Sequence, residues 1–175
     1  MEFYLLNELC DYVKNQENCH ALIDAGALVT GLSNFQVALF FIKHLLDIFL
    51  GVIFFCDKSK NLTVLTRDEK TMVLQDCYLD YRCLFAYLDD IHTRGTDIKL
   101  PFNAHAILTI GIGMEKDKLM QAAMRLRQLA QKQSVSLWST QAVTLVIKRG
   151  HLIDTEINSK QVIKYVTQNT TNSII

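Results

Sequence analysis

The chain has little of what would make it a fibrous, linker-like or strongly charged protein. Its 175 residues include seven glycines and one proline, too few for a collagen-like or proline-rich chain. Lys+Arg and Asp+Glu are each 18, so the formal net charge is zero and the basic surplus of a typical nucleic-acid-binding protein is missing. Half of the residues are hydrophobic, which favours one globular domain, or one domain with a small appendage.

The cysteines lack the spacing of a disulfide framework or a zinc site. There are five of them, an odd number, and no two form a CxxC pair. The start of the chain, Met1 to Leu6, holds a glutamate and no basic residue, unlike a secretory signal. We therefore expect reduced thiols in a cytosolic or nuclear protein, and no metal site.

The longest apolar stretch, from Phe35 to Phe55, contains Lys43, His44 and Asp47 near its middle. Each of these side chains is costly at the centre of a bilayer. Gly51 then divides the stretch. We expect a buried helix followed by a core strand, and no membrane association.

Apolar spacing predicts helices over 5–13, over 35–49 after an N-cap at Ser33, over 116–133, and from Ser159 to about Val166. The tail from Thr167 to Ile175 is polar and is expected to be frayed. Short apolar or β-branched runs predict strands, at 52–55, 62–66, 71–74, 84–88, 106–110, 134–138 and 142–147.

This order predicts an α/β fold with helices flanking a sheet. The first three strands are separated by polar turns, which favours a β-meander. The organisation expected is a helical segment over 1–50, an α/β core with the meander over 51–150, and a C-terminal helix and tail over 151–175.

A polar loop directly follows the strand 84–88, in the sequence His92-Thr-Arg-Gly-Thr-Asp-Ile-Lys-Leu-Pro101. α/β sheets place ligands at the carboxyl ends of strands. Gly95 allows close backbone approach, and Arg94, Thr96 and Asp97 offer a guanidinium, a hydroxyl and a carboxylate. The alternative is an ordinary strand-to-loop junction held by an Arg–Asp pair.

A second polar segment, Gln121 to Gln128, lies on the helix predicted over 116–133. Gln121 and Arg125 are four residues apart and share a helix face, whereas Arg127 projects elsewhere. The alternative for this segment is a solvated basic face.

Together the two segments resemble the C-terminal lobe of superfamily-two helicases, and especially the translocation motor SecA. By this resemblance Thr93, Arg94, Gly95, Thr96 and Asp97 form motif V, which contacts nucleotide and couples it to the substrate. Gln121 and Arg125 begin motif VI, whose arginines reach the γ-phosphate across a cleft between two lobes. The resemblance implies a RecA-like lobe.

The chain departs from that pattern in two ways. Where the family has a second motif VI arginine this chain has Gln128, and the nearest arginine is Arg127. On a helix, a shift of one residue turns a side chain by about 100°. The chain also lacks GxxxxGK[ST], the loop that cradles a triphosphate. It is therefore at most half of a motor, and ATP is a ligand only together with a partner lobe.

A wider resemblance runs from about residue 20 to residue 140. It rests on ALIDAGALVTGLSN (21–34), VLTR (64–67), YLDDIHTRGTDIKLP (87–101), DKLMQAAMRLR (117–127) and QSV (133–135). These strings resemble the very large eukaryotic proteins identified as ubiquitinyl hydrolases, or ubiquitin thioesterases. The resemblance implies cysteine-type deubiquitination, ubiquitin or its conjugates as partners, and further segments of a larger parent protein.

A thiol hydrolase needs a thiolate, a base and an orienting group. His92 is the best candidate base because it lies near Asp89 and Asp90, and Cys77 and Cys83 are the nearest thiols in sequence. The alternative is that the cysteines are small core residues, as expected for Cys56. Three hypotheses stay open: a ubiquitin-system hydrolase, a nucleotide-binding helicase-like lobe, and an interaction module without catalysis.

Overall fold

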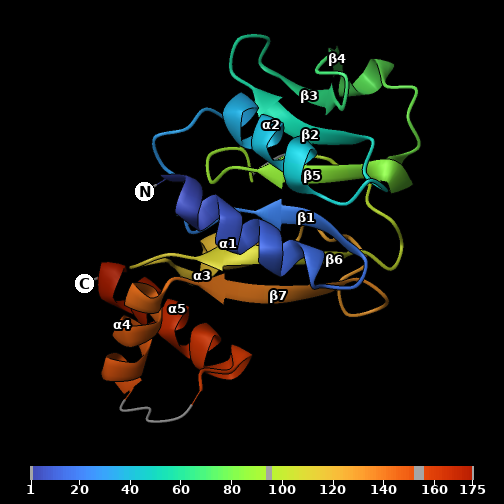
Figure 1. Ribbon diagram of the computed structural model, residues 1–175. Helices are drawn as coiled ribbons and strands as arrows, with labels where there is room; N and C mark the ends of the chain where they lie inside the picture. Colours follow the sequence, from blue (N-terminus) through green and yellow to red (C-terminus); the bar gives the residue numbers. More distant parts are fainter. Residues whose placement is uncertain (1, 94–95, 152–155, 175) are drawn as a thin grey trace.

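The computed structural model describes residues 2–93, 96–151 and 156–174, which form an α/β fold around a seven-stranded mixed sheet (Figure 1). The strand order is β4-β3-β2-β5-β1-β6-β7. The strands are β1 Cys19–Ile23, β2 Gly51–Cys56, β3 Asn61–Thr66, β4 Thr71–Val73, β5 Leu84–Leu88, β6 His105–Ile110 and β7 Ser134–Ser139. The helices are α1 Glu2–Lys14, α2 Asn34–His44, α3 Lys116–Ala123, α4 Gln141–His151 and α5 Ser159–Ile174.

The sheet has a parallel part and an antiparallel part. β2, β5, β1, β6 and β7 run parallel to their neighbours, with Ala21 opposite Ala86 and Leu108 opposite Leu137. β2, β3 and β4 pair antiparallel through tight turns, so the meander expected from the sequence is confirmed.

Helices cover both faces of the sheet (Figure 1). α1 and α2 bury Leu9 and Phe41 against one face, next to Phe85 of β5. α3, α4 and α5 bury Leu119 and Tyr165 against the other face. Both faces are therefore apolar, which explains why the sequences of the parallel strands are short continuous hydrophobic runs.

α2 begins as expected and ends earlier than expected. Ser33 caps it in a capping box with Gln36. It stops at His44 instead of residue 49, and the chain from Leu45 to Leu50 wraps around the guanidinium of Arg67. That group donates to the carbonyls of four residues at 2.7–3.2 Å, namely Ile42, Leu45, Leu46 and Phe49. The side chain of Arg67, which directly follows β3, therefore satisfies carbonyls at the end of α2 and in the loop that follows it.

Arg67→Lys is expected to lower the free energy of unfolding by roughly 2–3 kcal/mol, because an ammonium keeps the charge but cannot reproduce the planar fork of donors. Urea unfolding measures the change. Arg82→Lys is the matched control, since Arg82 makes an exposed pair with Asp80, and its effect should stay within about 0.5 kcal/mol. Equal effects of the two substitutions would contradict this role of Arg67.

Four other sequence expectations need correction. Residues 19–23, in the segment expected to be helical, form β1 in the middle of the sheet. Residues 142–147, expected to be a strand, lie in α4, where Val143 and Ile147 are buried one helical turn apart. α5 continues to Ile174, so the tail to that residue is not frayed. Finally, α3 ends at Ala123 and not at Gln133.

The end of α3 is set by tertiary contacts, since the sequence after it contains good helix formers. The side chain of Gln133 is buried. Its carbonyl oxygen accepts the N–H of Gln128, and its amide donates to the carbonyl of Pro101. Ala130 has a left-handed backbone with φ +71°. Residues 124–133 therefore form turns. In the described part of the chain, no helix is long and apolar enough to cross a membrane.

Candidate functional site

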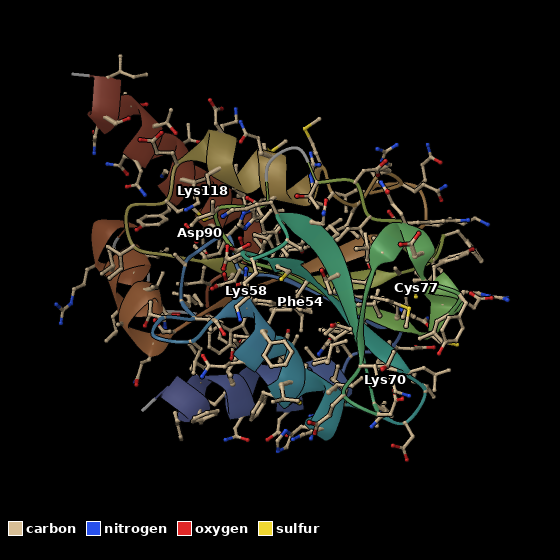
Figure 2. The ribbon with its side chains drawn as sticks, turned by 90° about the horizontal axis from the view of Figure 1, so that it is seen from above. Phe54, Lys58, Lys70, Cys77, Asp90 and Lys118 are labelled. Carbon is tan, nitrogen blue, oxygen red and sulfur yellow. The ribbon has the colours of Figure 1, made fainter. Side chains whose placement is uncertain are left out.

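The carboxyl ends of the parallel strands gather polar side chains at one edge of the sheet, where Figure 2 places Lys58, Asp90 and Lys118 together. The chain leaves β1 toward α2 on one face and leaves β6 toward α3 on the other face. Between these loops lies a crevice of about 450 Å³, lined by Ala25–Gly26, Gly111–Glu115 and the first turns of α3. Such switch points are where open α/β sheets bind ligands.

Two glycines let the loops that wall this crevice approach each other. A Cβ built on Gly111 would lie 2.4 Å from the carbonyl oxygen of Gly26, and one built on Gly26 would lie 2.6 Å from the backbone nitrogen of Gly111. Neither position accepts a larger residue unless backbone moves. The crevice therefore depends on glycine at both positions.

Asp24 holds the loop after β1 from inside the protein. Its side chain is 1% exposed. It accepts hydrogen bonds from the Thr109 hydroxyl at 2.6 Å and from the N–H groups of Leu28 and Val29 at 3.0 and 2.9 Å. Burial raises the pKa of the Asp24 carboxyl, and these hydrogen bonds oppose that rise. The residue is a structural support for the crevice, which sequence reasoning missed because β1 was not recognised.

The other wall of the crevice is closed by α5. The Tyr165 hydroxyl accepts the N–H of Gly113, and the Thr170 hydroxyl accepts the N–H of Lys116 at the start of α3. Asn169 donates to the carbonyl of Met114. The buried side-chain oxygen Oε1 of Gln121 has no hydrogen-bond partner among the described residues. Of the proposed motif VI residues, Gln121 therefore lines the crevice itself.

The two polar segments singled out in the sequence lie against each other. Arg125 donates from Nη1 to the carbonyl of Thr96 at 2.5 Å, and Arg127 pairs with Asp97 at 2.8 Å. Nearer the carboxyl edge, Lys118 lies 3.5 Å from Asp90. The order of the two motifs predicts that the loop 93–97 lies beside the amino-terminal half of the helix. Thr96 and Asp97 instead contact the turns after α3.

The residues that resemble motif V also include Thr93, Arg94 and Gly95. Thr93 is buried and donates its hydroxyl to the carbonyl of Asp90, and the Thr96 hydroxyl donates to the carbonyl of His92. These bonds fold the start of the loop. Arg94 and Gly95, also predicted to contact nucleotide, lie outside the described residues.

Asp97, Arg125 and Arg127 line one groove of about 410 Å³ on the α3 face of the sheet, together with Lys99 and Phe102. Because Arg125 and Arg127 lie in turns beyond Ala123, the 100° rotation expected for a one-residue shift on a helix does not apply to them. The guanidinium of Arg127 is largely exposed. The groove can therefore present two guanidinium groups and a carboxylate to a ligand.

His92 is held in the manner of an oriented base. Its Nδ1 lies 2.7 and 2.9 Å from the two carboxylate oxygens of Asp89. Its ring stacks on Phe55, with the ring centres 3.6 Å apart. A hydrogen bond at Nδ1 leaves Nε2 to act as the acceptor.

The structure does not bring a predicted thiol to His92. Cys83 precedes β5 whereas His92 follows it, so a strand of roughly 17 Å separates them. Figure 2 shows Cys77 on the far side of the view from Asp90, and its side chain packs against the core. Among the described residues, neither thiol makes a hydrogen bond with His92.

Cys56 differs from the buried residue expected. It ends β2 and is only half-buried, and hydrogen bonds from Ser59 lower the pKa of its thiol. By contrast, burial raises the pKa of Cys19 to about 12. The position of Cys56 immediately before the polar turn 57–60 is the sequence signal that could have distinguished it. All five cysteines are unpaired.

The described residues contain no group of three or more side chains placed to bind a metal ion. Comparisons with protein-family models, curated proteins and solved structures found no match for this chain.

Proposed function

We propose that the chain is the second lobe of a two-lobe, nucleotide-dependent motor. In this proposal a partner lobe holds the triphosphate, and Arg125 and Arg127 stabilise charge on its terminal phosphate. Thr96 and Asp97 couple that event to the rest of the lobe. The observation that carries the proposal is the contact of Arg125 with Thr96 and of Arg127 with Asp97, which joins two segments about thirty residues apart in the sequence.

The architecture supports a RecA-like assignment within this proposal. Five strands run parallel, helices lie on both faces, and the loop bearing Thr96 leaves the carboxyl end of a central strand. Loops at the carboxyl ends of parallel strands suit a nucleotide. The groove that holds Arg125 and Arg127 starts from the loop after β5 and extends toward the amino ends of the strands, where Tyr81, Phe102 and Gln133 line it. Arginine is the side chain best suited to phosphate, because its planar fork donates two parallel hydrogen bonds.

The test compares ATP hydrolysis by these 175 residues with hydrolysis by a longer form of the protein that includes a phosphate-cradling loop. The chain alone should not hydrolyse ATP, because arginines stabilise a phosphate already held elsewhere. The longer form should hydrolyse it. Robust hydrolysis by the chain alone that Arg125→Ala abolishes would contradict the proposal, as would a longer form that binds ATP but never turns it over.

A thiol hydrolase of the ubiquitin system is the second candidate, supported by one observation, the orientation of His92 by Asp89. In this hypothesis the nucleophile is one of the half-buried thiols, Cys56, Cys77 or Cys83, or comes from another part of a larger protein.

We expect the chain alone to react weakly or not at all with a ubiquitin carrying an electrophile at its C-terminus, because no described thiol meets His92. Mass spectrometry of the labelled chain measures this reaction. Rapid, stoichiometric labelling of Cys77 or Cys83, slowed by His92→Ala, would instead favour the hydrolase. Asp80→Ala, which removes an exposed pair with Arg82, is the control for nonspecific effects.

A further inference from the structure

The outer edge of β7 is open. Among the described residues β7 pairs only with β6, and the N–H of Ser134 points toward β6, where it donates to the carbonyl of Ala104. Backbone groups alternate along a parallel strand, so those of Val135 and Leu137 point away from the sheet. None of the described residues forms a hydrogen bond with them. In Figure 1, β7 is the last strand on its side of the sheet, and α4 and α5 lie below it toward its carboxyl end.

This edge lacks the features that usually protect an exposed strand. Proteins blunt such edges with short strands, charges or proline. β7 is six residues long, with the sequence Ser-Val-Ser-Leu-Trp-Ser, and carries no charge and no proline. At the opposite edge of the sheet, β4 has only three residues and directly follows the charged run Asp68-Glu69-Lys70. The edge at β4 therefore has features that protect it, whereas the edge at β7 lacks them.

A pocket of about 410 Å³ lies beside the open edge. Val135, Leu137, Ile157 and Val162 form the apolar part of its lining, and polar and charged side chains, among them Thr144, Lys148 and Glu156, complete it. Val135 and Leu137 project to the α3 face and are only half-buried. A strand added to β7 would direct every second side chain into this pocket.

We propose that β7 binds an extended peptide of a partner protein, which adds an eighth strand to the sheet and inserts apolar side chains at alternate positions into the pocket. Unpaired N–H and C=O groups along a strand are matched by an extended backbone, and the neighbouring pocket supplies side-chain specificity. The apolar part of the pocket favours apolar side chains at alternate positions of the peptide.

A second copy of this chain fits less well. Pairing through β7 alone would involve six residues on each side, whereas a stable interface uses about 20–30 residues and about 800 Å² per partner. A short peptide needs only the edge and the pocket. The proposal does not depend on nucleotide binding or on the arginine groove, so each can fail separately.

The first measurement is amide hydrogen exchange of the free chain, read by NMR. Val135 and Leu137 should exchange like unstructured amides, whereas Ser136 and Trp138, which face β6, should be protected. Protection of Val135 and Leu137 in the monomer would mean that the chain covers its own edge, and would overturn the proposal.

The second measurement selects peptides from a displayed library of random 12-residue sequences. Enriched peptides should carry apolar residues at alternate positions and should protect Val135 and Leu137 from exchange. Enriched peptides without that alternation, or no enrichment above an unrelated protein, would overturn the proposal. Protection that depends on the concentration of the chain, with a dimer in sedimentation, would assign the edge to a second copy and overturn the proposal.

Val135→Pro and Val135→Ala separate edge pairing from pocket filling. Both remove the valine side chain, but only proline removes the outward N–H while leaving the ladder to β6 intact. Val135→Pro should weaken peptide binding about tenfold relative to Val135→Ala, the effect of one unsatisfied backbone hydrogen bond. Equal affinities of the two folded variants would overturn the proposal. Leu137→Ala provides a further variant, in which peptides with smaller apolar residues should lose less affinity than those with larger ones.

Discussion

Arg125→Ala is expected to lower ATP turnover by about 10³- to 10⁵-fold in a form of the protein that contains both this chain and a phosphate-cradling lobe, because arginine fingers contribute factors of that size. Such arginines act on charge that develops as the phosphate is transferred. The loss should therefore fall on kcat much more than on the affinity for ATP. Steady-state kinetics and direct nucleotide binding together measure the two effects.

Arg149→Ala is the matched control for this substitution. Arg149 is an exposed arginine of α4, so its loss removes the same charge without touching the groove, and kcat should stay unchanged. A rise in KM at unchanged kcat for Arg125→Ala would assign Arg125 to uniform binding of substrate, contrary to the proposed function. Thermal unfolding of each variant shows whether its fold is retained.

Gly111→Ala is expected to lower the free energy of unfolding by about 3 kcal/mol or more, the upper range for overpacked sites. The added Cβ would meet the Gly26 carbonyl at 2.4 Å, and both partners are backbone. No side-chain rotation can relieve such a contact. Relief would require separating the loops after β1 and β6, and hence disturbing the hydrogen bond from Gly26 N–H to Thr109.

Gly150→Ala is the control for the same chemical change. Gly150 lies in α4 and no atom would meet its Cβ within 4 Å. Alanine should therefore stabilise the helix by about 0.5–1 kcal/mol. Urea unfolding of both variants gives the comparison. A Gly111→Ala protein as stable as the unsubstituted chain would show that the two loops are not held as close as the structure has them.

Local sequence patterns were sufficient for most strands. β2, β3, β4, β5, β6 and β7 were expected within one or two residues of their observed bounds, because each is a short apolar run between turn residues. β1 was missed, since the run from Ala21 to Leu28 is mostly small and apolar and was included in the helical segment over 1–50. The strand character of β1 comes from its neighbours on both sides, which are distant in the sequence.

Contacts between distant segments also explain why the predictions for residues 142–147 and for the C-terminal tail were wrong. Residues 142–147 are rich in β-branched side chains, yet they form a helix because Val143 and Ile147 fill the α3 face of the core. The polar residues Asn169 and Thr170 lie in the segment that was predicted to be frayed. Their side chains form hydrogen bonds with the loop between β6 and α3 and with the first residue of α3. Local propensity does not include such partners.

The candidate site was partly foreseeable. The loop over Thr96 and Asp97 was expected beside the amino-terminal half of the helix that carries Arg125, and it instead contacts Arg125 and Arg127 in the turns after α3. What the sequence did not indicate was the crevice formed by Gly26 and Gly111, because its recognition requires β1 to be placed beside β6. The position of His92 against Phe55 likewise joins residues from separate strands.

The central position of β1 bears on how the chain folds during synthesis. Ile23 pairs with Leu88, and Leu22 pairs with Ile107, so during synthesis β1 waits for partners that follow it by about 65 and 85 residues. At about 5–20 residues per second, that delay lasts several seconds or more. During this time the core around Phe41 of α2 and Phe54 of β2 is incomplete, because β5 and β6 have not yet been made. The nascent chain is therefore a strong candidate for binding by chaperones, and its refolding from denaturant should be slow compared with that of proteins of more local topology.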